Sequence, residues 1–177
     1  MSPDIEAMTP ILETPRLILR AHTAADLPAC CTLWADPGVT RFIGGRPSTA
    51  EEVWRRIIGY AGIWQLKGYG FFLAADRETG AIVGEFGIAD FHRDIVPPLG
   101  DTPEAGWAML PRYHGRGLAH EALSAVLDWA DDTIPRTVCM IAPDNAPSLK
   151  LAGKLGYAEY AQTTYRDHPI ILLARSS

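Results

Sequence analysis

Apolar residues recur along this chain at two spacings, one typical of helices and one typical of strands. The clearest helical pattern runs from Gly117 to about Asp131, where apolar residues return every three or four positions and form one stripe. A shorter helix is predicted from Asn145 to Gly156, because proline falls in its first turn and glycine stands at its end. Both helices follow predicted strands, which indicates that each packs on a sheet.

Two helices are predicted in the first half of the chain. The first begins at Thr23, with Asp26 as its partner in a capping box, and ends before Gly38. The second begins at Ser48, with Glu51 three residues later, and ends at Gly68. Apolar residues follow this second start at helical spacing, namely Val53, Trp54, Ile57, Ile58 and Ala61.

The remaining apolar segments are short, rich in β-branched or aromatic residues, and separated by turn residues. They are predicted strands at Arg16–Arg20, Phe71–Ala75, Ala81–Ala89, Ala105–Leu110, Thr137–Ile141, Ala158–Thr164 and Pro169–Ala174. This order predicts an α+β fold with a mixed, mostly antiparallel sheet flanked by helices. Residues 15–175 are expected to form a single domain, and residues 1–14 a lead-in.

Size and composition place the chain among ordinary soluble globular proteins. It has 177 residues, of which 47% are hydrophobic and 21% charged, and a formal net charge of −5. The acidic balance argues against a nucleic-acid partner and suits a cationic substrate such as an amine. No apolar run is long enough for a membrane span and no signal peptide is recognisable, so no membrane partner is expected.

Cysteine usage excludes two further kinds of site. The three cysteines include no CxxC pair, so neither a zinc site nor a disulfide framework is predicted, and no metal is expected. A cytoplasmic location fits this usage, because thiols stay reduced there. Cys139 falls in a buried strand, which argues against a covalent intermediate on that thiol.

A tight glycine loop joins the strand that ends at Leu110 to the helix that begins at Gly117. Gly115 and Gly117 lack a Cβ, so successive backbone N–H groups are free to converge. The helix start adds unpaired N–H groups and the positive end of its dipole. Two interpretations follow: the loop binds a phosphate-type anion, or glycine only relieves strain in a turn.

Three segments resemble the GNAT superfamily of acyl-CoA-dependent N-acetyltransferases. Arg112–Ala119 is similar to the family's [Q/R]-x-x-G-x-[G/A] pyrophosphate loop. Asn145–Tyr157 resembles its late N-x-x-S … K-L-G-[F/Y] segment. Glu13–Arg20 looks like the start of the ribosomal-protein N-acetyltransferase (Rim-type) branch. The resemblance covers about residues 15–175, nearly the whole chain.

The resemblance implies where acetyl-CoA would bind. The strand 107–110 would splay from the strand 138–141, and the pantetheine arm would lie between them, bonded to unpaired backbone groups and to the Asn145 side chain. The pyrophosphate would lie on the glycine loop. The expected cofactor-binding residues are Ala108, Met109, Leu110, Arg112, Gly115, Arg116, Gly117, Leu118, Ala119, Asn145 and Ser148.

Acetylation of an amine requires the amine to be neutral, so a general base is expected. Glu85 is one candidate, because its apolar neighbours would desolvate it and raise its pKa; the alternative is a charge on the solvent face of a strand. Glu104 is the other candidate, with an exposed strand start as its alternative, and His92 is a third. The sequence leaves the choice open.

Ser148 is the candidate for protonating or binding the departing thiolate. Many superfamily members carry a tyrosine four residues further on, but this chain has Ala152 there, and the resemblance to the Rim-type branch implies that the serine acts instead. The alternative is a serine that only satisfies N–H groups at the helix start.

The reaction we expect is direct transfer of acetyl from acetyl-CoA to a primary amine in a ternary complex. The acceptor is a protein N-terminus or a small-molecule amine, including an antibiotic or polyamine. The alternative is a non-catalytic acyl-CoA-binding regulatory module. The acceptor site would lie between residues 40–70 and 91–102, where Trp34, Trp54 and Trp64 either line it or fill the core. Both a monomer and a homodimer remain open.

Overall fold

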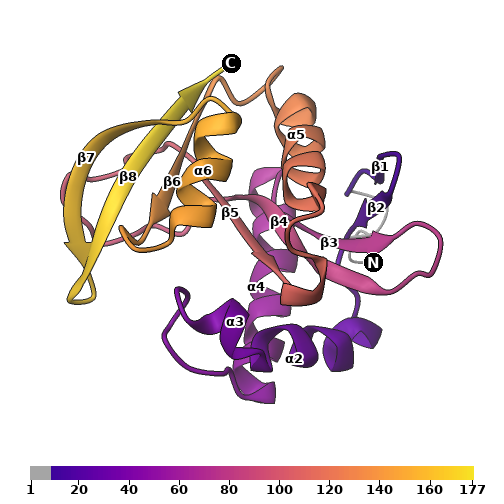
Figure 1. Ribbon diagram of the computed structural model, residues 1–177. Helices are drawn as coiled ribbons and strands as arrows, with labels where there is room; N and C mark the ends of the chain where they lie inside the picture. The colour runs from indigo at the N-terminus through magenta and orange to yellow at the C-terminus, as the bar shows by residue number, and fades with distance from the viewer. Residues whose placement is uncertain (1–8) are drawn as a thin grey trace.

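The computed structural model describes residues 9–177 and contains one mixed sheet of eight strands (Figure 1). The strands are β1 (Leu12–Glu13), β2 (Leu17–Arg20), β3 (Phe71–Asp76), β4 (Ile82–Ala89), β5 (Glu104–Met109), β6 (Arg136–Ile141), β7 (Ala158–Tyr165) and β8 (His168–Ser176). Of the expected lead-in, residues 1–8 lie outside the described residues, while Leu12–Glu13 pairs with β2 as an edge strand.

The strand order is β1-β2-β3-β4-β5-β6-β8-β7, and every neighbouring pair is antiparallel except β5 and β6. The predicted fold class, a mixed and mostly antiparallel sheet flanked by helices, is therefore confirmed. The parallel pair lies in the middle of the sheet, with β7 and β8 on one side and β1 and β2 on the other (Figure 1).

The parallel pair is joined only where it begins. Glu104 is paired with Val138, and the Val138 N–H donates to the Pro103 carbonyl at 3.0 Å. No further residue of β5 is paired with β6 within residues 9–177. The predicted splaying of these two strands is thus present, and it divides the sheet into two halves.

Helices join and cover these strands: α2 (Leu27–Ala35), α3 (Pro37–Thr40), α4 (Ala50–Lys67), α5 (Leu118–Ala130) and α6 (Ala146–Lys154), with short 3₁₀ turns at Ala24–Asp26 and Pro111–Tyr113. The capping box predicted at Thr23 is present, since its N–H donates to the Asp26 carboxylate at 2.8 Å, but it caps the 3₁₀ turn, and α2 begins four residues later at Leu27. The predicted start at Ser48 is wrong by one residue. Thr49 is extended and accepts from the Glu52 N–H, whereas the Ser48 N–H donates to the Trp34 carbonyl.

The buried face of α4 also differs from the prediction. Val53 and Ile57 are buried as expected, but Trp54 is 39% exposed and Ile58 is 52% exposed. The inward stripe continues instead through Tyr60 and Trp64, which lie on the same face as Val53 and Ile57. Tyr60 and Trp64 therefore take the places at the interface between α4 and the sheet that were predicted for Trp54 and Ile58.

The core is continuous from the sheet into the helices. Phe72 of β3 contacts Trp64 of α4 and Trp129 of α5, with ring centroids 5.0 and 5.7 Å apart. The ring of the neighbouring Phe71 stacks on the ring of Tyr60, with centroids 4.6 Å apart. Among residues 9–177, no helix is both long and apolar enough to cross a membrane.

Candidate active site

The glycine loop leaves β5 through the Pro111–Tyr113 turn and enters α5. Gly115 and Gly117 have φ angles of 73° and 76°, a region that favours glycine. The backbone N–H groups of Gly115, Arg116 and Gly117 donate to no acceptor within residues 9–177, and those of Leu118 and Ala119 belong to the unpaired first turn of α5. The loop thus presents a run of free N–H donors at a helix start, as an anion requires.

The N-terminal segment holds this loop in place. Arg16 forms an ion pair with Glu121 of α5, and its guanidinium also donates to the Arg116 carbonyl at 2.8 Å. The side chains of Arg112 and Arg116 are exposed, and both lie over the Tyr113 ring. Two cations thus flank the free N–H groups without an acidic partner within residues 9–177.

A cleft of about 940 Å³ opens where β5 and β6 part. Its floor is Glu104–Ala108 of β5, and its walls are Met140–Asn145 with Ser148, the segment 41–48 before α4, and the β7–β8 turn. The cleft brings together four of the predicted site residues: Glu104, Ala108, Asn145 and Ser148. Met109, Leu110 and the glycine loop lie outside its lining.

Met109 and Leu110 already use part of their backbone hydrogen-bonding capacity. The exposed His114 ring donates from Nε2 to the Met109 carbonyl at 2.9 Å, and the Leu110 N–H donates to the Val83 carbonyl at 3.1 Å. The predicted contact of these two residues with the pantetheine arm stays a prediction. The His114 bond closes the start of the glycine loop onto β5.

Ser148 lies at the start of α6 and faces β5. Its Oγ accepts a hydrogen bond from the Trp107 indole N–H at 3.2 Å, and its backbone N–H donates to Asn145 Oδ1 at 3.3 Å. Because the indole occupies a lone pair, the serine hydroxyl proton is left free to donate elsewhere. The sequence did not indicate Trp107 as a partner, since the contact crosses from β5 to α6.

Glu85 is fully buried in β4 and is surrounded by donors. The Trp34 N–H and the Tyr60 hydroxyl each donate to Oε2 at 3.1 Å, and His22 Nε2 lies 3.3 Å from Oε1, an ion-pair distance without hydrogen-bond geometry. Burial raises the pKa of Glu85, but His22, Trp34 and Arg56 together outweigh it and hold the pKa below its usual value. The predictions of a raised pKa and of a solvent-facing charge are both wrong.

Cys30 completes this group, which we call the Glu85 cluster: His22, Cys30, Trp34, Tyr60 and Glu85. Ligand-type atoms of His22, Cys30 and Glu85 lie within 4.8 Å of one another. Burial and the charge of Glu85 raise the pKa of the Cys30 thiol, so it stays protonated and adds another donor beside the carboxylate. Burial and Glu85 likewise raise the pKa of Tyr60 well above its usual range. The cluster is a buried carboxylate held ionised by its neighbours.

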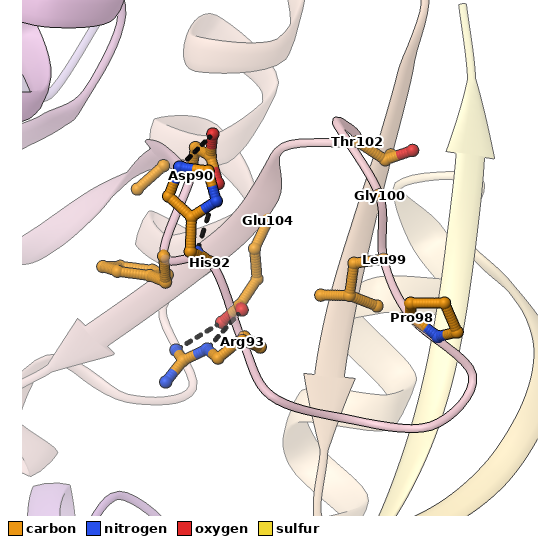
Figure 2. Close-up of a pocket in the computed structure, with 10 residues that line it drawn as sticks. Asp90, His92, Arg93, Pro98, Leu99, Gly100, Thr102 and Glu104 are labelled. Atoms are coloured by element: carbon orange, nitrogen blue, oxygen red, sulfur yellow. Dashed lines mark hydrogen bonds and ion pairs between the residues drawn. The ribbon is translucent and has the colours of Figure 1, made fainter.

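Glu104 is 8% exposed, so the alternative of an exposed strand start is wrong. Arg93 binds its carboxylate with two hydrogen bonds, of 2.8 and 2.9 Å. Figure 2 shows this pair beside a smaller cavity of about 160 Å³ under the Pro98–Thr102 loop. The third base candidate, His92, faces Asp90 there, and 78% of its side chain is exposed. Glu104 borders both cavities.

Of the three tryptophans considered for the acceptor site, only Trp34 lines the cleft. Trp64 is a core residue whose N–H donates to the Phe71 carbonyl, and Trp54 is partly exposed away from the lining. Arg93, Tyr60 and Arg56 also line the cleft, and sequence reasoning missed them. The helical stripe of α4 could have indicated that Tyr60 is buried, but no local signal marked Arg93 or Arg56.

Comparison with known proteins identifies, along most of the chain, the same family that the sequence motifs resemble. Residues 16–158 match the family model described as an acetyltransferase (GNAT) domain. The chain is 27% identical, over 82% of its length and 81% of the relative's, to an uncharacterized N-acetyltransferase, p20, of Bacillus licheniformis.

Solved structures share the fold. A GNAT-family acetyltransferase from Bordetella pertussis matches with a TM-score of 0.84 and 31% identity, covering 94% of this chain and 99% of that one. A ribosomal L7/L12 alpha-N-protein acetyltransferase, RimL, in complex with coenzyme A matches with a TM-score of 0.77 and 18% identity, covering 94% and 98%. At that identity the second match concerns the fold alone.

Proposed function

This chain belongs to the GNAT acetyltransferase family, and from that premise we propose that it transfers an acetyl group from acetyl-CoA to a primary amine, by direct attack in the cleft between β5 and β6. The observation that carries the proposal is the parting of these two strands beside a loop of free N–H groups. One feature provides a channel for a thioester arm, and the other provides donors for its diphosphate.

The residues present fit this cosubstrate. Gly115 and Gly117 leave no Cβ over the free N–H groups, while Arg112 and Arg116 add positive charge beside them. Within residues 9–177, no cysteine lines the cleft, and the Cys139 thiol of β6 is buried, which raises its pKa and keeps it protonated. A cysteine-linked acetyl intermediate is therefore not part of the proposal.

Acetyl-CoA supplies an activated thioester, and the chain's own residues orient it and move protons. Ser148 is proposed to donate its hydroxyl proton to the departing thiolate, with Trp107 holding the oxygen in position, and to recover a proton through solvent, which takes up the one that the base removed from the amine. Glu104 is proposed to accept the amine's proton, directly or through water, because it lines the cleft. Glu85 does not line the cleft but accepts hydrogen bonds from Trp34 and Tyr60, which do, so its proposed role is to position them.

The assignment of the base is tested by the pH dependence of the rate. Glu104→Gln should flatten the acidic limb of the kcat/KM profile, because the group that must be deprotonated is gone. Glu85→Gln should lower the rate without changing the shape of that limb. The reverse outcome would assign the base to Glu85.

Thiol release from acetyl-CoA in the presence of an amine panel tests the function itself. The panel should contain peptides with free N-termini and small-molecule amines, since both remain candidate acceptors. Release that depends on the amine is expected. Heat of CoA binding without any amine-dependent release would instead favour the acyl-CoA-binding regulatory module.

The free thiols of Cys30, Cys31 and Cys139 support a cytoplasmic site of action.

A further inference from the structure

The charge of the cleft differs in sign from that of the whole chain. The chain has a formal charge of −5, but the cleft lining contains five arginines and only three carboxylates. The arginines are Arg41, Arg46, Arg56, Arg93 and Arg166. The local field around an acceptor is set by these nearby groups, because charges beyond about 10 Å are largely screened at moderate salt.

Two of the five arginines are already neutralised. Arg46 pairs with Glu52, and Arg93 pairs with Glu104. Within residues 9–177, Arg41, Arg56 and Arg166 have no carboxylate within ion-pair distance. Arg41 and Arg166 therefore face the cleft without an acidic partner in the described chain, while Arg56 has no direct ion pair and is attracted to the buried Glu85 and to the Tyr60 hydroxyl.

Arg56 is the most firmly placed of the three. Its guanidinium lies 3.7 Å from the centre of the Trp34 ring, and its Nε is buried without a hydrogen-bond partner in the described part of the chain. The Trp34 N–H is held in turn by Glu85, which fixes the ring beneath the cation. Because Nε itself is covered, a ligand acceptor in the cleft would bind the terminal N–H groups of this guanidinium, whose charge no direct ion pair in the described chain neutralises.

The other two cations line the same cleft from two other segments of the chain. Arg41 belongs to the segment between α3 and α4, and Arg166 belongs to the β7–β8 turn, where it and Asp167 have positive φ angles. Neither segment includes the glycine loop, whose own arginines, Arg112 and Arg116, are absent from the cleft lining. The three cations are therefore separate from the proposed diphosphate site.

We propose that the acceptor carries an anionic group, a carboxylate or phosphate, close to the amine that is acetylated, and that Arg56 binds this group with help from Arg41 and Arg166. This inference rests on the proposed acetyl transfer and narrows its substrate class. Acceptors of this kind include amino acids with a free carboxylate and peptides with an acidic residue near the N-terminus. A plain polyamine would be disfavoured by like charge.

Matched acceptors test the inference. The kcat/KM for thiol release is measured with pairs that differ only in charge: an amino acid and its amide, and a peptide with glutamate or glutamine at its second position. The acidic member of each pair should have a kcat/KM at least about tenfold higher, since a guanidinium–carboxylate contact is a charge-assisted hydrogen bond. Arg56→Gln should reduce that preference at least about fivefold.

Arg55→Gln is the matched control. Arg55 is the neighbouring residue on α4, has a side chain that is 73% exposed and pairs with Glu51 on the outer face, so its loss should leave the preference unchanged. Equal kcat/KM within the pairs, or an Arg56→Gln variant that retains the preference, would overturn the inference and leave acetyl transfer standing. The same holds if Arg56→Gln raises only the KM for acetyl-CoA.

A complete lack of thiol release with every amine would count against the proposed function instead. The inference is then decided by calorimetry on the CoA-loaded protein. Tighter binding of the acidic member of each pair, lost in Arg56→Gln and kept in Arg55→Gln, would support it. Equal binding of both members would overturn it.

Discussion

The glycine loop and the Glu85 cluster are built in opposite ways. The loop is five consecutive residues, 115–119, whose useful groups are backbone N–H donors. The cluster takes five side chains from four places along the chain, between His22 and Glu85, and four of them surround the carboxylate of the fifth, Glu85. One region depends on backbone conformation, and the other depends on long-range packing.

This difference explains why the glycine loop could be predicted from the sequence and the Glu85 cluster could not. A positive φ angle demands glycine locally, so Gly115 and Gly117 mark the loop without reference to the rest of the fold. The residues next to Glu85 in the sequence do not indicate that Trp34, Tyr60 and His22 are its partners. Mutations in the two regions should also have different effects. Removing a member of the buried cluster should lower the free energy of unfolding, whereas distorting the exposed loop should lower the affinity for the ligand.

Glu85→Gln should have the largest effect on stability and should disrupt the Glu85 cluster without disturbing the glycine loop. It removes a buried charge whose neighbours are all donors, so the free energy of unfolding should fall by about 3 kcal/mol. Urea denaturation measures this, with the exposed Glu78→Gln as the control, expected to change stability by less than about 0.5 kcal/mol. CoA affinity should be nearly unchanged in the folded variant. Loss of CoA binding without loss of stability would contradict the separation of the two regions.

The pH dependence of stability sharpens the same point. The pKa of Glu85 is below its usual value of 4.5 in the folded protein, so its contribution to stability is complete above about pH 4.5 and lost as the pH falls through the folded pKa. Unfolding free energies measured from pH 7 down to 3 should therefore fall less steeply for Glu85→Gln than for the unaltered protein. Parallel curves would contradict the lowered pKa.

Ser148→Ala should have the next largest effect, lowering kcat about 100-fold. Ser148 lines the cleft and belongs to neither region, so both stability and CoA affinity should change little. Steady-state kinetics and calorimetry with CoA separate these quantities. Ser124→Ala, on the outer side of α5, is the control and should retain full kcat. An unchanged kcat in Ser148→Ala would remove the proposed proton donor.

Gly117→Val should weaken CoA binding about 30-fold, because a β-branched residue at φ +76° adds about 2 kcal/mol of strain and turns the N–H groups away. Gly80→Val introduces the same strain at φ +71° in the β3–β4 turn, far from the loop in sequence. Both variants should lose similar stability, but only Gly117→Val should lose CoA affinity in calorimetry. Equal losses of affinity would show that strain alone, and not the loop, is responsible.

Trp107→Phe should have the smallest effect, lowering kcat about fivefold, since it removes one hydrogen bond of about 1 kcal/mol that orients the Ser148 hydroxyl. The double variant with Ser148→Ala should be no slower than Ser148→Ala alone, because the two residues act through one contact. Additive losses would mean that Trp107 acts on the substrate in another way.

Prediction from sequence succeeded where the signal was local and failed where it crossed the sheet. The strand–loop–helix unit around Gly117 and the start of the helix at Asn145 both follow from backbone chemistry within a few residues. The start of α4 was misplaced because Ser48/Glu51 and Thr49/Glu52 are equally good capping pairs, and a contact of Ser48 with Trp34 decides between them. The inward face of α4 was misjudged because its aromatic residues pack against β3.

The order of amino acids by itself determined the fold class and the glycine loop, because periodicity, glycine placement and helix caps act over distances of a few residues, whereas the parting strands were expected only from the family resemblance. Only the tertiary structure decided that Glu85 is ionised and buried, that Glu104 is held by Arg93, and that the cleft of an acidic protein is lined with arginine. Charge and protonation depend on which side chains meet in space, and those meetings join residues as far apart as His22 and Glu85.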